Sequence, residues 1–217
     1  MIHTTSLIVL HYTKLGETRI VLHALTPDWG RRSFLATVKG GAGMSLFLPL
    51  NVLDAEVVEN PKSDLWQLRS VTARHPLNGI RGNLYKNTMT LFMSEVLYRT
   101  IRDGSREEGL FDWCERSILT LDAIESDFSN FHLRFLIELA GALGFQASPE
   151  DLLPFVGVYK REIDVLCGPD FSRAMILPLN GASRSEIAES LLDYLRFHTE
   201  SSINIQSLKV LRELYRI

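Results

Sequence analysis

The first 75 residues alternate between short apolar runs and turn-forming residues. Runs rich in β-branched residues cover positions 7–12, 18–26, 33–38, 52–58 and 65–73. The separators at 14–17 and 27–30 have the glycine, proline and charged residues that are typical of turns. The first three runs can pair only antiparallel, because a parallel crossover needs about a dozen or more residues between strands. The pattern predicts a β-meander, and its length favours a five-stranded OB-like barrel.

After residues 75–79 the hydrophobic period changes from two to 3.6. Tyr85, Met89, Phe92, Met93 and Val96 share one helical face, on a helix that should end near residues 103–104. Further helices are predicted over 107–125 and 130–143, after Ser148, from 183 to about 198, and at the end of the chain with Leu208, Leu211 and Tyr215 facing inward. The 130–143 segment is apolar almost all round, which indicates the centre of a bundle.

These patterns predict an α+β chain with two domains. Residues 1–77 should form an OB-like β-barrel that binds nucleic acid, and residues 78–217 a mostly α-helical domain. The stretch 156–179 has no clear period, and we expect a short irregular or β excursion there.

A group of basic residues marks the third predicted strand. Arg31 and Arg32 stand at its entrance beside Trp29, and Lys39 follows its end. Cations and an aromatic on a small curved sheet are typical of a platform for single-stranded nucleic acid. The alternative is that these are ordinary solvated charges, which protect edge strands from aggregation.

Charge and composition narrow the possibilities. The formal net charge is −3, so binding to nucleic acid would depend on a local patch. Residues 1–80 hold 8 Lys and Arg against 6 Asp and Glu, net +2, and residues 81–217 hold 15 against 20, net −5. The two cysteines suggest neither a disulfide framework nor a zinc site, and no apolar stretch is long enough to span a membrane. We expect a soluble cytoplasmic protein.

No residue set indicates catalysis. The glycine-rich 39–43 segment lacks the Gly-Lys-Ser/Thr and the helix of a phosphate loop, and no G-x-S-x-G nucleophile motif occurs. His11 and His23 could meet across adjacent strands, with His3 nearby, but no further ligands stand at a fixed spacing. We expect a protein that is not an enzyme and holds no metal or cofactor.

Several motifs in this order resemble the RecO family of bacterial recombination mediators. The opening IVLHY at 8–12, GET at 16–18 and TPDWGR at 26–31 resembles the first hairpin of that family. The pair LF at 110–111, then NFHLRF at 130–135 and LGF at 143–145, resembles its central helix, and SLKVLRELY at 207–215 its closing helix.

The resemblance implies a function and partners. Members of the family bind single- and double-stranded DNA, anneal complementary strands, and help load the RecA recombinase with RecR and, in many systems, RecF. They also dock on the C-terminal tail of single-strand-binding protein. A similar protein would be cytoplasmic and associated with the nucleoid during repair.

The resemblance also assigns roles to residues. Arg31, Arg32 and Lys39 become the leading phosphate contacts, with Lys14 and Arg19 as further ones. Arg134, a cation on an otherwise apolar helix, corresponds to the arginine that meets the partner tail in some members. Its alternative is an internal pair with a carboxylate.

Two departures from the family open a second hypothesis. The chain lacks the four zinc-binding cysteines of many members, and its loop after the third strand is short and poor in cations. Fewer cations predict weaker DNA binding. The alternative function is a protein-interaction adaptor whose OB-like domain has little DNA affinity of its own.

Overall fold

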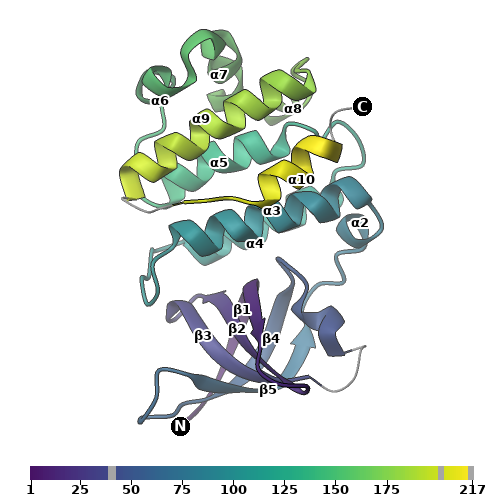
Figure 1. Ribbon diagram of the computed structural model, residues 1–217, viewed down its shortest axis with the longest axis vertical. Helices are drawn as coiled ribbons and strands as arrows, with labels where there is room; N and C mark the ends of the chain where they lie inside the picture. Colours follow the sequence, from purple (N-terminus) through teal and green to yellow (C-terminus); the bar gives the residue numbers. More distant parts are fainter. Residues whose placement is uncertain (39–42, 200–202, 215–217) are drawn as a thin grey trace. The chain divides into compact units, whose positions relative to one another are not determined.

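The computed structural model describes residues 1–38, 43–199 and 203–214 (Figure 1). The chain divides into two compact units: Met1–Asn78 with Ile101–Ile118, called the barrel unit, and Gly79–Thr100 with Leu119–Ile217, called the helical unit. The predicted domains 1–77 and 78–217 stay a prediction, because the compactness of a unit does not test whether either part folds alone.

Within the described residues, five strands close a barrel in the order β1-β2-β3-β5-β4. The neighbouring strands are antiparallel except for β3 and β5, which pair in parallel at Phe34 with Trp66 and Leu35 with Gln67. This confirms the predicted OB-like barrel. The strands are β1 (Ile2–Lys14), β2 (Arg19–Thr26), β3 (Gly30–Thr37), β4 (Val52–Val58) and β5 (Trp66–Ala73).

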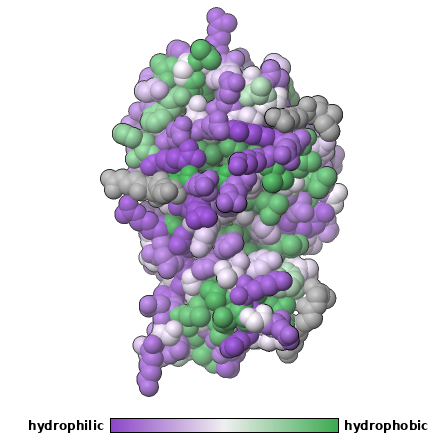
Figure 2. Space-filling model, viewed as in Figure 1, coloured by the Kyte–Doolittle hydropathy of each residue, from purple (hydrophilic) through white to green (hydrophobic). Residues whose placement is uncertain are grey.

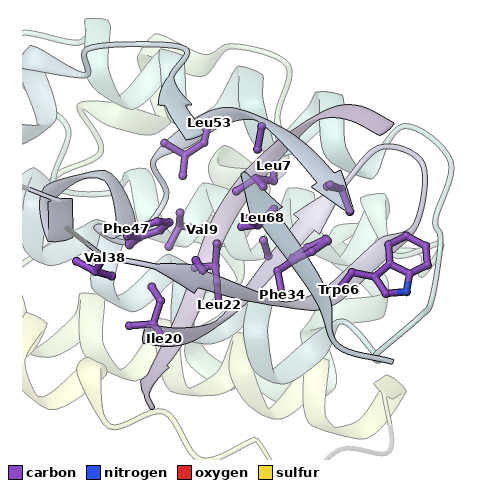
Figure 3. Close-up of a cluster of buried hydrophobic side chains, with 14 residues drawn as sticks. Leu7, Val9, Ile20, Leu22, Phe34, Val38, Phe47, Leu53, Trp66 and Leu68 are labelled. Atoms are coloured by element: carbon purple, nitrogen blue, oxygen red, sulfur yellow. The ribbon is translucent and has the colours of Figure 1, made fainter. Parts of the chain in front are cut away.

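Strand alternation fills the barrel. Successive side chains point to opposite faces, so Ile20 and Leu22 on β2 and Phe34 on β3 point inward and are at most 2% exposed. Burying each such side chain stabilises the fold by about 1.5–3 kcal/mol. Figure 3 shows Trp66 at one end of this core and Val38 with Phe47 at the other.

A later segment of the chain completes the barrel unit. Arg31 and Asp103 form an isolated parallel bridge, and the backbone N–H of Gly104 donates to the Arg31 carbonyl oxygen at 2.8 Å. The helix α4 (Leu110–Ala123) begins seven residues after Asp103. Backbone pairing therefore places Asp103 and Gly104, which follow the helix that ends at Thr100, in the barrel unit.

The helical unit is built around α5 (Phe131–Ala142). This helix packs against α3 (Leu84–Thr100), α7 (Lys160–Cys167) and α9 (Gly181–Thr199), and Figure 1 shows α5 and α9 side by side. Leu133 and Leu139 on α5 are fully buried, as the apolar pattern predicted. The short elements are α2 (Asn78–Arg81), α6 (Pro149–Val156), α8 (Phe171–Met175) and α10 (Ser207–Leu214), with the 3-10 turns η1 (Ser45–Phe47) and η2 (Gly157–Tyr159).

Of the irregular or β excursion predicted near 156–179, the β alternative is wrong, because η2, α7 and α8 occupy most of this stretch. Irregular backbone is found only in the connections at 168–170 and 176–179. Ile163 and Leu166 of α7 are buried three residues apart on one helical face. These two positions are too few to reveal the helical period, and no capping side chain marks the start of α7, because its N-cap residue Tyr159 makes no side-chain cap hydrogen bond. Gly168 then ends α7 as its C-cap.

The last helix is capped from a distant part of the chain. The carboxylate of Glu95 on α3 accepts from the backbone N–H groups of Gln206 at 3.1 Å and Ser207 at 2.9 Å. A carboxylate at a helix N-terminus satisfies orphan donors and complements the helix dipole. The sequence-based prediction named inward-facing Leu208 and Leu211, which are buried, while Tyr215 lies outside the described residues.

The surface of the described chain is mixed. Hydrophilic residues cover most of the face in Figure 2, with hydrophobic residues gathered in smaller patches between them. None of the helices in the described ranges combines the length and the apolar character needed to cross a membrane.

Candidate nucleic-acid interface

Four side chains meet at one end of the barrel and form what we call the barrel-end cluster: His3, Trp29, Arg32 and Trp66. The rings of Trp29 and Trp66 meet edge to face with centroids 5.2 Å apart, and His3 meets Trp29 edge to face at 5.5 Å. His3 is also nearly parallel to Trp66, at 6.4 Å. The cluster unites residues from β1, β3, β5 and the β2–β3 turn.

Arg32 lies flat on Trp66. Its guanidinium carbon is 3.5 Å from the centroid of the Trp66 ring. The register explains the contact. Phe34 on β3 pairs with Trp66 on β5, and Arg32, two residues before Phe34, points to the same inner face of the strand. Such a cation–π contact contributes roughly 0.5–2 kcal/mol.

One hydrogen-bonding donor of Arg32 is unused. Its Nε is buried and has no hydrogen-bond partner in the described part of the chain. The stack on Trp66 holds the side chain in position. The residue as a whole is half-buried. Arg32 is therefore a pre-positioned cation whose remaining N–H groups can bind an anion.

Arg31 lies in a different environment from its neighbour. Its side chain is 18% exposed, Nη1 donates to the carbonyl oxygen of Ile101 at 2.8 Å, and Nε lies 3.5 Å from Oδ1 of Asp103. The guanidinium thus ties β3 to the segment that precedes α4. Its charge is shared with a carboxylate, which reduces its attraction for phosphate.

Trp29 is half-buried and packs against the barrel core. Its backbone N–H donates to the Thr26 hydroxyl at 3.1 Å, which fixes the turn. The burial follows from the neighbouring Trp66 and His3, which come from strands distant in the sequence.

Lys14 and Arg19 lie at the other end of β2. Both are exposed, and the backbone N–H of Leu15 donates to the Arg19 carbonyl at 2.8 Å to close the β1–β2 hairpin. In the register Arg19 faces Thr37 while Arg32 faces Ala24. Five residues along a strand separate the two positions, about 17 Å. Lys39 lies outside the described residues.

The histidines do not form a three-membered group. His11 and His23 pair across β1 and β2 with ring centroids 5.9 Å apart, and His23 Nδ1 lies 2.8 Å from the Ser33 hydroxyl. Burial lowers the pKa of His23, and His11 and Arg31 lower it further. His3 belongs to the barrel-end cluster instead. Across residues 1–38, 43–199 and 203–214, no three His, Cys, Asp or Glu side chains gather as metal ligands.

Arg134 joins two helices of the helical unit. Its Nη1 donates to the carbonyl oxygens of Leu166 and Gly168, both at 2.5 Å, and its Nε to Glu138 at 2.5 Å. The side chain is 16% exposed. Two of its three nitrogens therefore satisfy the C-terminal carbonyls of α7 and a carboxylate one turn away, so the internal pair considered from the sequence is present.

The sequence-based set omitted Trp66 and His3. Trp66 lies in the predicted strand 65–73, where an aromatic is common, and no local pattern shows that β5 returns to pair with β3. His3 stood out only as a possible metal ligand. The signal that could have found Trp66 is the small number of tryptophans, since Trp29 and Trp66 are two of the three in the chain.

The fold and the cluster define a class of protein: an OB-like barrel with a cation and aromatics at one end, in a chain that continues into a helical unit. The family model described as "Recombination protein O C terminal" matches residues 81–150.

Curated relatives match almost the full chain. The DNA repair protein RecO of Bacteroides fragilis is 30% identical over 241 residues, covering 99% of this chain and 100% of that protein. The protein of the same name from Phocaeicola vulgatus is 28% identical over 240 residues, with 99% and 100% coverage, and that of Flavobacterium psychrophilum is 25% identical over 238, with 97% and 98%. This chain belongs to the RecO family.

Proposed function

We propose that this chain is a DNA repair and recombination mediator that binds DNA through its barrel unit. Its relatives carry the name DNA repair protein, and the barrel fits an OB fold, which binds oligonucleotides on strand faces and adjoining loops. The observation that carries the proposal is Arg32, a cation held on the Trp66 ring at 3.5 Å at one end of the barrel.

The other cations have graded roles in this proposal. Lys14 and Arg19 are exposed and provide a second contact with the backbone of DNA, about 17 Å from Arg32 along β2. Lys39 stays a candidate phosphate contact. Arg31 contributes indirectly, because it fixes the backbone next to Arg32.

We further propose the partners and activities that the family resemblance implies. The protein anneals single strands and helps load RecA with RecR, with RecF as an additional partner. It docks on the tail of single-strand-binding protein, and Arg134 takes part through Nη2, for which the described residues record no hydrogen bond. A tail carboxylate suits a guanidinium in this way.

The experiment that tests DNA binding is fluorescence anisotropy of a labelled single-stranded oligonucleotide across a salt series. Backbone binding predicts an affinity that falls with salt, with a slope of about 0.7 per phosphate contact on single strands. Absence of binding at low salt would contradict the proposal.

The adaptor hypothesis remains the second candidate, favoured by a specific observation. Arg31 is occupied within the protein and Trp29 is half-buried, so fewer groups are available to DNA than the sequence suggested. An adaptor would capture RecR or single-strand-binding protein while showing no DNA affinity at low salt.

A further inference from the structure

The Arg32 guanidinium is planar and has two faces, of which Trp66 covers one. The ring centroid lies 3.5 Å from the guanidinium carbon, the spacing of two stacked planes. Trp66 itself is 8% exposed and is fixed by the core and by the edge contact with Trp29. Arg32 therefore rests on a rigid support and presents its other face away from the indole.

We propose that this outer face of Arg32 is a base-stacking subsite, in which an unpaired nucleobase of single-stranded DNA forms the third layer over guanidinium and indole. The inference rests on the proposed DNA binding and specifies which part of the DNA the barrel-end cluster recognises.

The chemistry of the guanidinium suits this role. A guanidinium plane stacks on a base as an aromatic ring does, while the N–H groups at its edge stay in plane and reach phosphate. Every base has a π-face, so the subsite tolerates any sequence. In a duplex both faces of each base are already stacked, so the subsite favours single strands.

The charges around the cluster favour a base over a phosphate as its main ligand. Glu59 lies 3.4 Å from His3, and the Asp28 carboxylate accepts from the Thr5 hydroxyl at 3.3 Å, beside Trp29 in the chain. These acids repel a phosphate but not a neutral base. The exposed Lys14 and Arg19, by contrast, stand on a hairpin that offers charge and no aromatic ring to stack on.

The test compares an oligonucleotide that carries bases with an abasic oligonucleotide of the same length, measured by anisotropy on the full chain. The wild-type protein should bind the base-carrying strand about tenfold more tightly. Arg32→Lys keeps the charge but loses the plane, so it should bind the two strands equally, with its affinity for the abasic strand unchanged.

A matched control is Arg69→Lys, because Arg69 is an exposed arginine that is not among the proposed DNA contacts. This variant should keep the preference for bases, and thermal melts of all variants check that they are folded. Equal affinity of the wild type for both strands, or a preference that survives in Arg32→Lys, would overturn the subsite while DNA binding stands. If the wild type binds neither strand, the proposed function itself fails.

Discussion

The guanidinium of Arg31 donates to the carbonyl oxygen of Ile101 at 2.8 Å, 70 residues further along the chain. This bond gives two adjacent arginines different tasks, since Arg32 makes its contact with the Trp66 ring. Arg31 holds the conformation of this end of β3, and Arg32 is the proposed contact with DNA.

Substituting each arginine in turn should separate these tasks. Arg31→Ala removes a charge-assisted hydrogen bond from a mostly buried group and should lower the free energy of unfolding by about 2 kcal/mol. Arg32→Ala should change stability by less than about 1 kcal/mol but weaken oligonucleotide binding severalfold. Denaturant unfolding and anisotropy on both variants check this. A stable Arg31→Ala protein with the larger loss of DNA affinity would contradict the assignment.

Gly30 is required at its position for two reasons. Its φ is +61°, and an added Cβ would lie 1.7 Å from the Ser105 carbonyl oxygen, which is backbone and cannot turn aside. Gly30→Ala should therefore lower the free energy of unfolding by about 3 kcal/mol.

A second glycine provides the matched control. Gly16 has φ +74° but nothing within 4 Å of an added Cβ. Gly16→Ala should lower the free energy of unfolding by only about 1 kcal/mol, from the backbone conformation alone, and urea titrations of both variants measure the difference. Equal losses for the two variants would show that the Ser105 contact is unimportant.

Removing Arg134 should loosen the helical unit. Arg134→Ala leaves the Leu166 and Gly168 carbonyl oxygens without this donor and should lower the free energy of unfolding by about 3 kcal/mol. Glu138→Ala, which removes only the partly exposed partner, should cost less than about 1 kcal/mol. Calorimetry of both variants measures the difference, and an unchanged melting temperature for Arg134→Ala would refute the structural role.

The buried His132 should make stability depend on pH. Burial lowers its pKa to about 3 in the folded protein, Arg184 contributing further, against 6.5 as the ordinary value. As pH falls below 6.5 the unfolded chain binds a proton that the folded chain does not. Stability is therefore retained above 6.5 and lost toward pH 3, by about 2 kcal/mol between pH 6.5 and 5.

Urea unfolding across this pH range checks the dependence, with His132→Gln as the reference. The two proteins share all other titrating groups. Between pH 6.5 and 5 the variant should therefore lose about 2 kcal/mol less of its free energy of unfolding than the wild type. Parallel slopes in the two proteins would contradict the prediction.

Local patterns in the sequence were sufficient for most elements of the fold. The apolar runs between turn-forming residues placed the barrel strands, and the apolar 130–143 stretch indicated the buried helix α5. Both signals arise because several consecutive turns of a helix, or several residues of a strand, bury apolar side chains. The short helix α7 gives no such signal, and no capping side chain marks its start.

The candidate site was less accessible to sequence reasoning. Arg32 and Trp29 could be named because they are close in the chain, but Trp66 reaches them through the parallel pairing of β3 with β5. The internal partners of Arg31, Ile101 and Asp103, come from a segment between two helices. Contacts across such separations follow from topology, which one sequence does not display.

The seam between β3 and β5 consists of two paired positions, and one of them is Trp66. Trp66, which supports Arg32, therefore also takes part in the shortest strand pairing of the barrel. A ligand that binds only when Trp66 is in place stabilises the pairing of β3 with β5, because it shifts the equilibrium away from the state in which these strands are separated. Hydrogen exchange of the β5 amides should then slow when a ligand is bound at the barrel-end cluster. β3 and β5 should separate most often in the unbound protein.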